Sequence, residues 1–275
     1  MKCLIDTWKW LIVETNSDRI IQEFSSGQKN VALVYNEKYG KCIRKTRSAN
    51  TSTARIEREV NIQNDFNSEY YPKIYYSEIN SNNILIYEEY VEGNDLFEIL
   101  AGNNIYKNNQ KKCLELLLDL IEALDLIWNK SIVHRDIKPN NIKMRPNGKP
   151  VILDLGIAKL LDSTDNLTTR MWFTPGYAPI EQFTNRIDLI DKRTDFFSLG
   201  VVIYELFFGQ RLFLSNEEVI SKNPNFNQAG FSNTQKFNLI ISKLLEKQIY
   251  RRYRKSIDIV NDVKNALEEC LWVII

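Results

Sequence analysis

The 275-residue sequence lacks the features that would indicate a metal-binding, redox or disulfide-stabilised protein. Its four cysteines form no C-x-x-C pair, so neither a zinc site nor a thiol redox motif is indicated. A chain of this length can bury a sizeable core and does not need a disulfide framework. We therefore expect free thiols in a reducing compartment and predict a cytoplasmic location.

Long apolar runs and an excess of one charge are also missing. Asp6 and Lys9 interrupt the first apolar stretch, and the apolar residues 271–275 are far fewer than the about 20 needed to span a bilayer. Lys and Arg total 36 while Asp and Glu total 35, which gives a net charge of +1. This balance argues against a chain that coats nucleic acid or an anionic membrane. We expect no nucleic-acid partner and no membrane insertion.

The first 90 residues or so predict strands and one helix. Short apolar runs separated by polar turns predict an antiparallel meander, followed by a further strand. Apolar spacing predicts a helix over Thr53–Phe66. The strands are expected at residues 20–24, 31–35, 42–45 and 84–87.

The remainder of the chain is predicted to be mostly helical. Leucine and isoleucine residues between 114 and 124 follow an amphipathic helical pattern, whereas residues 196–208 are apolar nearly all round. The second pattern predicts a helix buried on every side. Between these two helices, an Asn-Gly turn flanked by Asn-Ile-Lys-Met and Val-Ile-Leu predicts a hairpin over residues 141–153.

This division predicts an α+β fold with two lobes and no internal repeat. We expect an N-terminal extension over residues 1–18, a smaller antiparallel-sheet lobe with one helix over 19–91, and a larger helical lobe over 92–275. A short connection near residues 89–93 would join the two lobes and leave a cleft. Ligands favour clefts of this kind.

Residues 134–141 concentrate side chains that carry chemistry. Asp136 is followed by Lys138 and Asn141, and a second acid, Asp154, comes where an apolar strand ends. An Asn and an Asp at opposite ends of one hairpin can bind a hard cation such as Mg²⁺, which prefers oxygen ligands.

The run His-Arg-Asp-Ile-Lys-Pro-Asn-Asn resembles the catalytic loop of eukaryotic-type protein kinases, H-R-D-x-K-P-x-N, and Asp154 resembles the start of their D-F-G motif, with Leu155 in place of Phe. Residues 174–182 are similar to the segment that ends in A-P-E, with the Ala-Pro shifted by one position. Residues 195–200 resemble the start of the helix that supports the catalytic loop. The resemblance covers almost the whole chain and implies the bilobal kinase fold.

The resemblance also implies the roles of the C-terminal site residues. Asp136 would orient the substrate hydroxyl and accept its proton, and Lys138 would steady the γ-phosphate of ATP. Asn141 and Asp154 would hold Mg²⁺. Lys138 points to serine and threonine hydroxyls of protein substrates. The implied activity is therefore an ATP- and Mg²⁺-dependent protein serine/threonine kinase.

In the N-terminal lobe, the resemblance implies a strand lysine that positions the phosphates and a helix acid that holds it. We assign Lys45 and Glu59 to these roles, with Ile43 on the same strand face toward the adenine. A shift of one residue would instead place Arg44 at the phosphates and Cys42 over the adenine. Glu57 is the alternative to Glu59.

The nucleotide is further expected to contact Gly27 and the backbone groups of Glu89 and Val91. Gly27 marks a departure from the family, whose G-x-G-x-x-G loop has three glycines where this chain has one. Backbone N–H groups bind phosphate, so the loop can still act with altered contacts. A pseudokinase that binds nucleotide as a scaffold remains an alternative, as does a small-molecule phosphotransferase, although such enzymes usually lack the lysine at 138.

The segment from Asp154 to Glu181 is expected to make two contacts with other parts of the chain. Glu181 is expected to form a shielded ion pair with Arg252, and Thr174 is expected to contact Asp136 and Lys138.

Regulation is expected within the same segment. Arg135 precedes the catalytic Asp, and in kinases such an arginine often belongs to a basic pocket that receives a phosphate. We place the regulatory phosphosite at Thr168 or Thr169. A segment that is ordered without phosphate is the alternative.

Overall fold

The computed structural model describes residues 18–26, 29–48, 53–66, 68–80, 83–155, 173–226 and 235–272. The chain divides into two compact units, Met1–Val91 and Glu92–Ile275. Among the described helices, none has the length and apolar character that a membrane crossing requires. Cys42 and Cys113 are buried free thiols.

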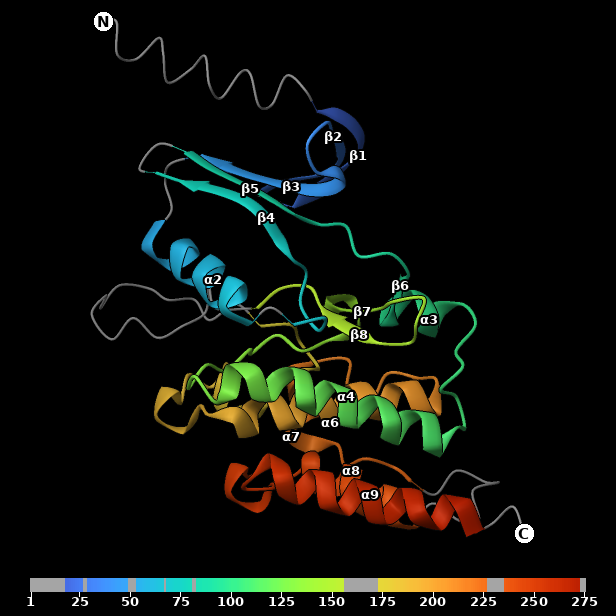
Figure 1. Ribbon diagram of the computed structural model, residues 1–275. Helices are drawn as coiled ribbons and strands as arrows, with labels where there is room; N and C mark the ends of the chain where they lie inside the picture. The colour runs from blue at the N-terminus through green and yellow to red at the C-terminus, as the bar shows by residue number, and fades with distance from the viewer. Residues whose placement is uncertain are drawn as a thin grey trace, which may run out of the picture. The chain divides into compact units, whose positions relative to one another are not determined.

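The first unit combines an antiparallel sheet with one helix, α2, as predicted (Figure 1). The sheet has five strands in the order β1-β2-β3-β5-β4. Helix α2 covers Thr53–Phe66, the range that its apolar spacing predicts. The strands are β1 (Arg19–Ser26), β2 (Lys29–Asn36), β3 (Gly40–Ser48), β4 (Ile74–Ile79) and β5 (Asn83–Glu89).

The two faces of this sheet bury different side chains because neighbours along a strand point to opposite sides. On one face, Ile84 and Ile86 of β5 pack with Val60 and Ile56 of α2. The other face carries a separate cluster of buried side chains. Helix α2 therefore covers the face that bears Ile84 and Ile86. The cluster on the other face includes Val34, Cys42, Leu85 and Tyr87.

Strand β4 was not predicted from the sequence. It lies at the edge of the sheet beside β5, and most of its residues are half-buried. An edge strand of this kind shows no clean alternation of apolar and polar residues, and that alternation is the sequence signal for a half-buried strand.

The second unit is mainly helical, as predicted, with one small antiparallel sheet in the order β6-β7-β8. Its helices are α3 (Leu96–Ala101), α4 (Gln110–Trp128), α5 (Ile180–Phe183), α6 (Lys192–Phe208), α7 (Asn216–Ser221), α8 (Gln235–Leu244) and α9 (Ser256–Trp272). The strands are β6 (Asn94–Asp95), β7 (Ile142–Met144) and β8 (Pro150–Ile152), and the 3₁₀ turns are η1 (Pro139–Asn141), η3 (Ile187–Leu189) and η4 (Ile249–Arg251).

Helix α6 is the central element of the second unit. Every residue from Thr194 to Phe208 is buried, which confirms the prediction of a helix covered on all sides. At its start the Asp191 carboxylate accepts a hydrogen bond from the Arg193 N–H. The helix ends at Gly209, whose φ of 68° is the left-handed conformation with which glycine commonly ends a helix.

The predicted ion pair between Glu181 of α5 and Arg252 is present and buried. Arg252 Nη1 lies 2.6 Å from Glu181 Oε1, and Nη2 lies 3.1 Å from Oε2. The Glu181 side chain is 3% exposed and the Arg252 side chain 0%. Arg252 also donates to the carbonyl groups of Arg193, Glu246 and Lys247. The pair thus connects α5 to the start of α6 and to the chain that precedes α9.

We predict that Glu181→Gln strongly destabilises the protein, because it leaves the buried Arg252 charge without its counter-ion. Breaking one side of a buried pair costs about 3–5 kcal/mol. Urea denaturation followed by circular dichroism measures this free energy.

The control is Asp188→Asn, which breaks an exposed pair with Arg186. Ion pairs in full contact with water contribute little to stability, so the urea midpoint of this variant should stay close to that of the wild type. An equal loss of unfolding free energy in the two variants would contradict the prediction.

Candidate active site

The predicted catalytic loop leads directly into the predicted hairpin. Pro139 opens the 3₁₀ turn η1, which ends at Asn141, and β7 and β8 then pair antiparallel. Beyond β8, the Leu153 N–H donates to the Asn141 carbonyl over 3.0 Å. This hydrogen bond brings the backbone that precedes Asp154 beside Asn141, as the hairpin prediction required.

A buried carboxylate of α6 holds the backbone that precedes Asp136. Asp195 accepts hydrogen bonds from the backbone N–H groups of His134 and Arg135, at 2.9 and 2.8 Å, and from Trp128 Nε1 at 2.8 Å. Burial raises the pKa of Asp195, while the charge of His134 and these donors act in the opposite direction. The buried helix therefore fixes where the loop begins.

Arg135 adopts a backbone conformation that is uncommon for a residue with a side chain. Its φ is 66°, in the left-handed region, and the residue is buried. Asp195 binds its N–H group, and Gln182 Nε2 donates to its carbonyl over 2.7 Å. Such strain persists when surrounding contacts determine the conformation. No role was predicted for Gln182, because only the fold brings it to Arg135.

Asp136, Lys138 and Thr174 form one connected polar network. Thr174 Oγ1 donates to Asp136 Oδ1 over 2.8 Å, and Lys138 Nζ donates to Thr174 Oγ1 over 2.9 Å. Lys138 Nζ also lies 3.1 Å from Asp136 Oδ2. The contacts that we predicted for Thr174 are therefore present. The network places a carboxylate and an ammonium group side by side, where one can accept a proton and the other can face negative charge.

Asn141 joins this network through its amide nitrogen. Nδ2 lies 2.9 Å from the Asp136 carbonyl oxygen and 3.2 Å from Asp136 Oδ2. Because both contacts use the nitrogen, Oδ1 can serve as a ligand. Asp154 is partly exposed at the end of the hairpin. An amide oxygen and a carboxylate suit Mg²⁺, so this pair of residues fits the predicted metal.

The segment that follows Thr174 is tied to the end of α6 by a second buried acid. Glu205 accepts a hydrogen bond from the Tyr177 hydroxyl at 2.7 Å, and Arg211 Nε lies 3.0 Å from its Oε1. Burial raises the pKa of Glu205. These contacts anchor the backbone close to Thr174 and so help to hold Thr174 at Asp136.

In the first unit, the strand register separates Lys45 from the alternative Arg44. Lys45 pairs with Ile86 across β3 and β5, so it lies on the face that α2 covers. Ile43 shares that face. Arg44 points to the other face, where its Nη1 lies 2.8 Å from Asp18 Oδ2. This placement favours Lys45 as the residue that faces the helix acid.

Lys45 contacts Glu88, an acid for which no role was predicted. Its Nζ lies 2.7 Å from Glu88 Oε1. The side chain of Glu59 lies outside the described residues, although its backbone belongs to α2, and Glu57 is exposed. The predicted pair of Lys45 with Glu59 therefore stays a prediction.

The other expected site residues are placed only in part. Gly27, Thr168 and Thr169 lie outside the described residues. Val91 is buried, and the Glu89 N–H donates to a backbone carbonyl, that of residue 73, over 2.8 Å. A base that binds Glu89 would therefore use its carbonyl group.

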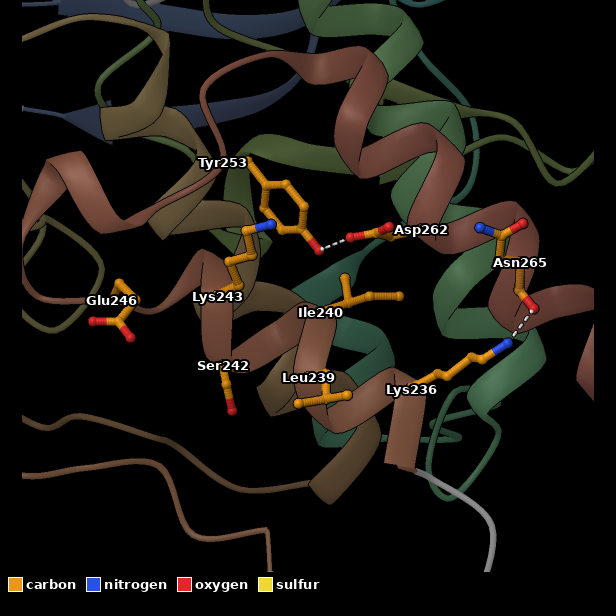
Figure 2. Close-up of a pocket in the computed structure, with 9 residues that line it drawn as sticks. All are labelled: Lys236, Leu239, Ile240, Ser242, Lys243, Glu246, Tyr253, Asp262 and Asn265. Atoms are coloured by element: carbon orange, nitrogen blue, oxygen red, sulfur yellow. Dashed lines mark hydrogen bonds between the residues drawn. The ribbon is translucent and has the colours of Figure 1, made fainter.

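A hollow of about 490 Å³ lies on the surface of the second unit, beside α8 and α9 (Figure 2). Its polar groups largely bind one another. The Tyr253 hydroxyl donates to Asp262 over 2.7 Å, and Lys236 Nζ reaches the Asn265 carbonyl. Lys243 Nζ lies 4.0 Å from the centre of the Tyr253 ring. The residues that line this hollow include none of the predicted site residues.

Comparison with known proteins agrees with the resemblance seen in the sequence. The family described as "Protein kinase domain" matches residues 27–271. Serine/threonine-protein kinase PrkC of Bacillus subtilis is 31% identical over 189 residues, which cover 66% of this chain and 28% of the relative.

Two other relatives extend this similarity. Probable serine/threonine-protein kinase PknB of Bifidobacterium longum is 33% identical over 132 residues, covering 48% of this chain and 19% of the relative. Serine/threonine-protein kinase cds1 of Schizosaccharomyces pombe is 29% identical over 213 residues, covering 74% of this chain and 45% of the relative. The chain thus spans less than half the length of these three curated relatives.

We predict that Thr174→Val slows the expected phosphate transfer while the fold is retained. The change removes a hydrogen bond to a charged group, and such bonds contribute about 1.5–3 kcal/mol, or roughly ten- to a hundredfold in rate. Initial rates at saturating ATP measure the effect. Thr184→Val is the control, because Thr184 is exposed and bonds to a carbonyl within its own turn. A Thr174→Val rate equal to that of the control would contradict the prediction.

Proposed function

Because the chain belongs to the protein kinase family, we propose that it transfers the γ-phosphoryl group of ATP to serine and threonine hydroxyls of proteins. The observation that carries this proposal is the network of Asp136, Lys138 and Thr174. The named relatives, which are serine/threonine kinases, support the choice of substrate class.

The proposed reaction needs a proton acceptor and charge stabilisation. The substrate hydroxyl oxygen forms a bond to the γ-phosphorus while the bond to the β–γ bridging oxygen breaks, and its electron pair leaves with ADP. Asp136 orients the hydroxyl and accepts its proton. Lys138, beside Asp136, faces the charge that builds on the transferred group. Positioning and electrostatics supply most of the catalysis.

The remaining roles concern the phosphates and the base. Asn141 and Asp154 would hold Mg²⁺, which neutralises phosphate charge when bound. In the first unit, Lys45 binds the phosphates. The backbone groups of Glu89 and Val91 bind the adenine edge.

The second candidate is a nucleotide-binding pseudokinase, which the single loop glycine, Gly27, favours. The two functions differ in turnover. Incubation with γ-labelled ATP, Mg²⁺ and a generic protein substrate distinguishes them. Labelled serine or threonine supports the kinase, and nucleotide binding without transfer supports the pseudokinase.

We predict that Asp136→Asn lowers the rate of transfer by about 10²- to 10⁴-fold, the range expected on loss of a general base. Asp154→Asn should abolish transfer at limiting Mg²⁺, because it removes a charged metal ligand. Both acids are partly exposed, so the circular dichroism spectrum should stay that of the wild type. Undiminished labelling in either variant would rule out the mechanism.

We further predict that replacing both Thr168 and Thr169 by Ala lowers activity toward an added substrate. A phosphate carries about −1.5 to −2 charge and can order a segment through hydrogen bonds to arginine. Phosphosite mapping of the active protein, together with rates for the double variant, tests this. Full activity with no phosphate at either residue would instead support a segment that is ordered without phosphate.

A further inference from the structure

Lys45 forms an ion pair with Glu88, an acid that has no role in the proposed reaction. Lys45 Nζ lies 2.7 Å from Glu88 Oε1, and the two side chains are 34% and 9% exposed. Glu88 is the residue before Glu89, at the end of β5. A nearly buried carboxylate therefore contacts the lysine proposed to bind the nucleotide phosphates.

The sheet itself determines this contact. Across β3 and β5, Lys45 pairs with Ile86 and Ile43 pairs with Glu88, so Lys45 and Glu88 are diagonal neighbours on one face. Diagonal neighbours in an antiparallel pair are within reach of long side chains. Because backbone hydrogen bonds join the two strands, their separation does not depend on the placement of α2.

We propose that Glu88 is a positioning residue of the nucleotide site, which holds the Lys45 ammonium group in place for the phosphates. This inference rests on the proposed function of Lys45. An ammonium group has three N–H donors, so one lysine can donate to Glu88 and to phosphate oxygens at the same time. Glu88 also pairs with Ile43, the residue expected to lie next to the adenine.

If the pair served only to stabilise the fold, loss of Glu88 would lower the free energy of unfolding and leave the nucleotide affinity unchanged. Lys45 is about a third exposed, so water can solvate its ammonium group once the Glu88 charge is removed, and the loss of stability should be small. Loss of Glu88 should therefore appear in nucleotide binding rather than in the unfolding transition. Glu88→Gln keeps the size and shape of the side chain, removes its charge and replaces one acceptor oxygen by an NH2 donor.

The test measures the dissociation constant of a non-hydrolysable ATP analogue with Mg²⁺ by calorimetry on the full chain. We expect Glu88→Gln to weaken binding by about tenfold, the lower end of the loss seen when a residue that orients a metal ligand is replaced. The KM for ATP should rise similarly. Glu78→Gln is the matched control, because Glu78 pairs with Leu85 on the other face of the same sheet.

Coupling between the two residues makes the test specific. Lys45→Met should also weaken binding, and the Lys45→Met/Glu88→Gln double variant should bind no more weakly than Lys45→Met alone. Additive losses would overturn the inference, as would wild-type or tighter binding by Glu88→Gln. A change in the unfolding midpoint without a change in affinity would also overturn it.

The same experiment separates this inference from the proposed function. If the wild type binds the analogue and the variants behave as expected but no phosphate is transferred, the kinase proposal fails and the role of Glu88 stands. If the wild type transfers phosphate while Glu88→Gln binds normally, only the inference fails. Absence of nucleotide binding by the wild type would overturn both.

Discussion

The carboxylate of Asp195 lies fully buried in α6, where it can persist only if hydrogen bonds replace the water it has lost. The donors come from Trp128 and from the backbone of His134 and Arg135. Satisfying one acid in the core therefore determines the path of the chain immediately before Asp136. Gln182 binds the other side of Arg135, at its carbonyl group, so the loop is held from two elements of the second unit.

The site that follows this anchor combines a carboxylate, an ammonium group, a hydroxyl and an amide that contact one another. Lys138 lies beside Asp136, and Thr174 contacts both. Asn141 uses its amide nitrogen on Asp136, which leaves its oxygen for a cation. Hydrogen bonds and an ion pair thus orient these polar side chains, which is the condition that electrostatic catalysis of the proposed reaction requires.

In the first unit, the two faces of one sheet separate two kinds of polar chemistry. Arg44 pairs with Asp18 on one face, and Lys45 pairs with Glu88 on the other. A shift of one residue in β3 would exchange these environments, because successive side chains point to opposite faces. The register of β3 therefore decides which cation can reach a ligand on the face that α2 covers.

The sequence by itself determined the elements whose signal is local or whose motif is distinctive. Apolar spacing was sufficient for α2 and for the buried helix α6, and the resemblance to kinases led to the pair of Glu181 with Arg252, 71 residues apart. Only the tertiary structure decided that Gln182 holds Arg135 and that Glu88 contacts Lys45. Such contacts join segments that are distant in the chain, and the local spacing of residues does not report which distant segments pack together.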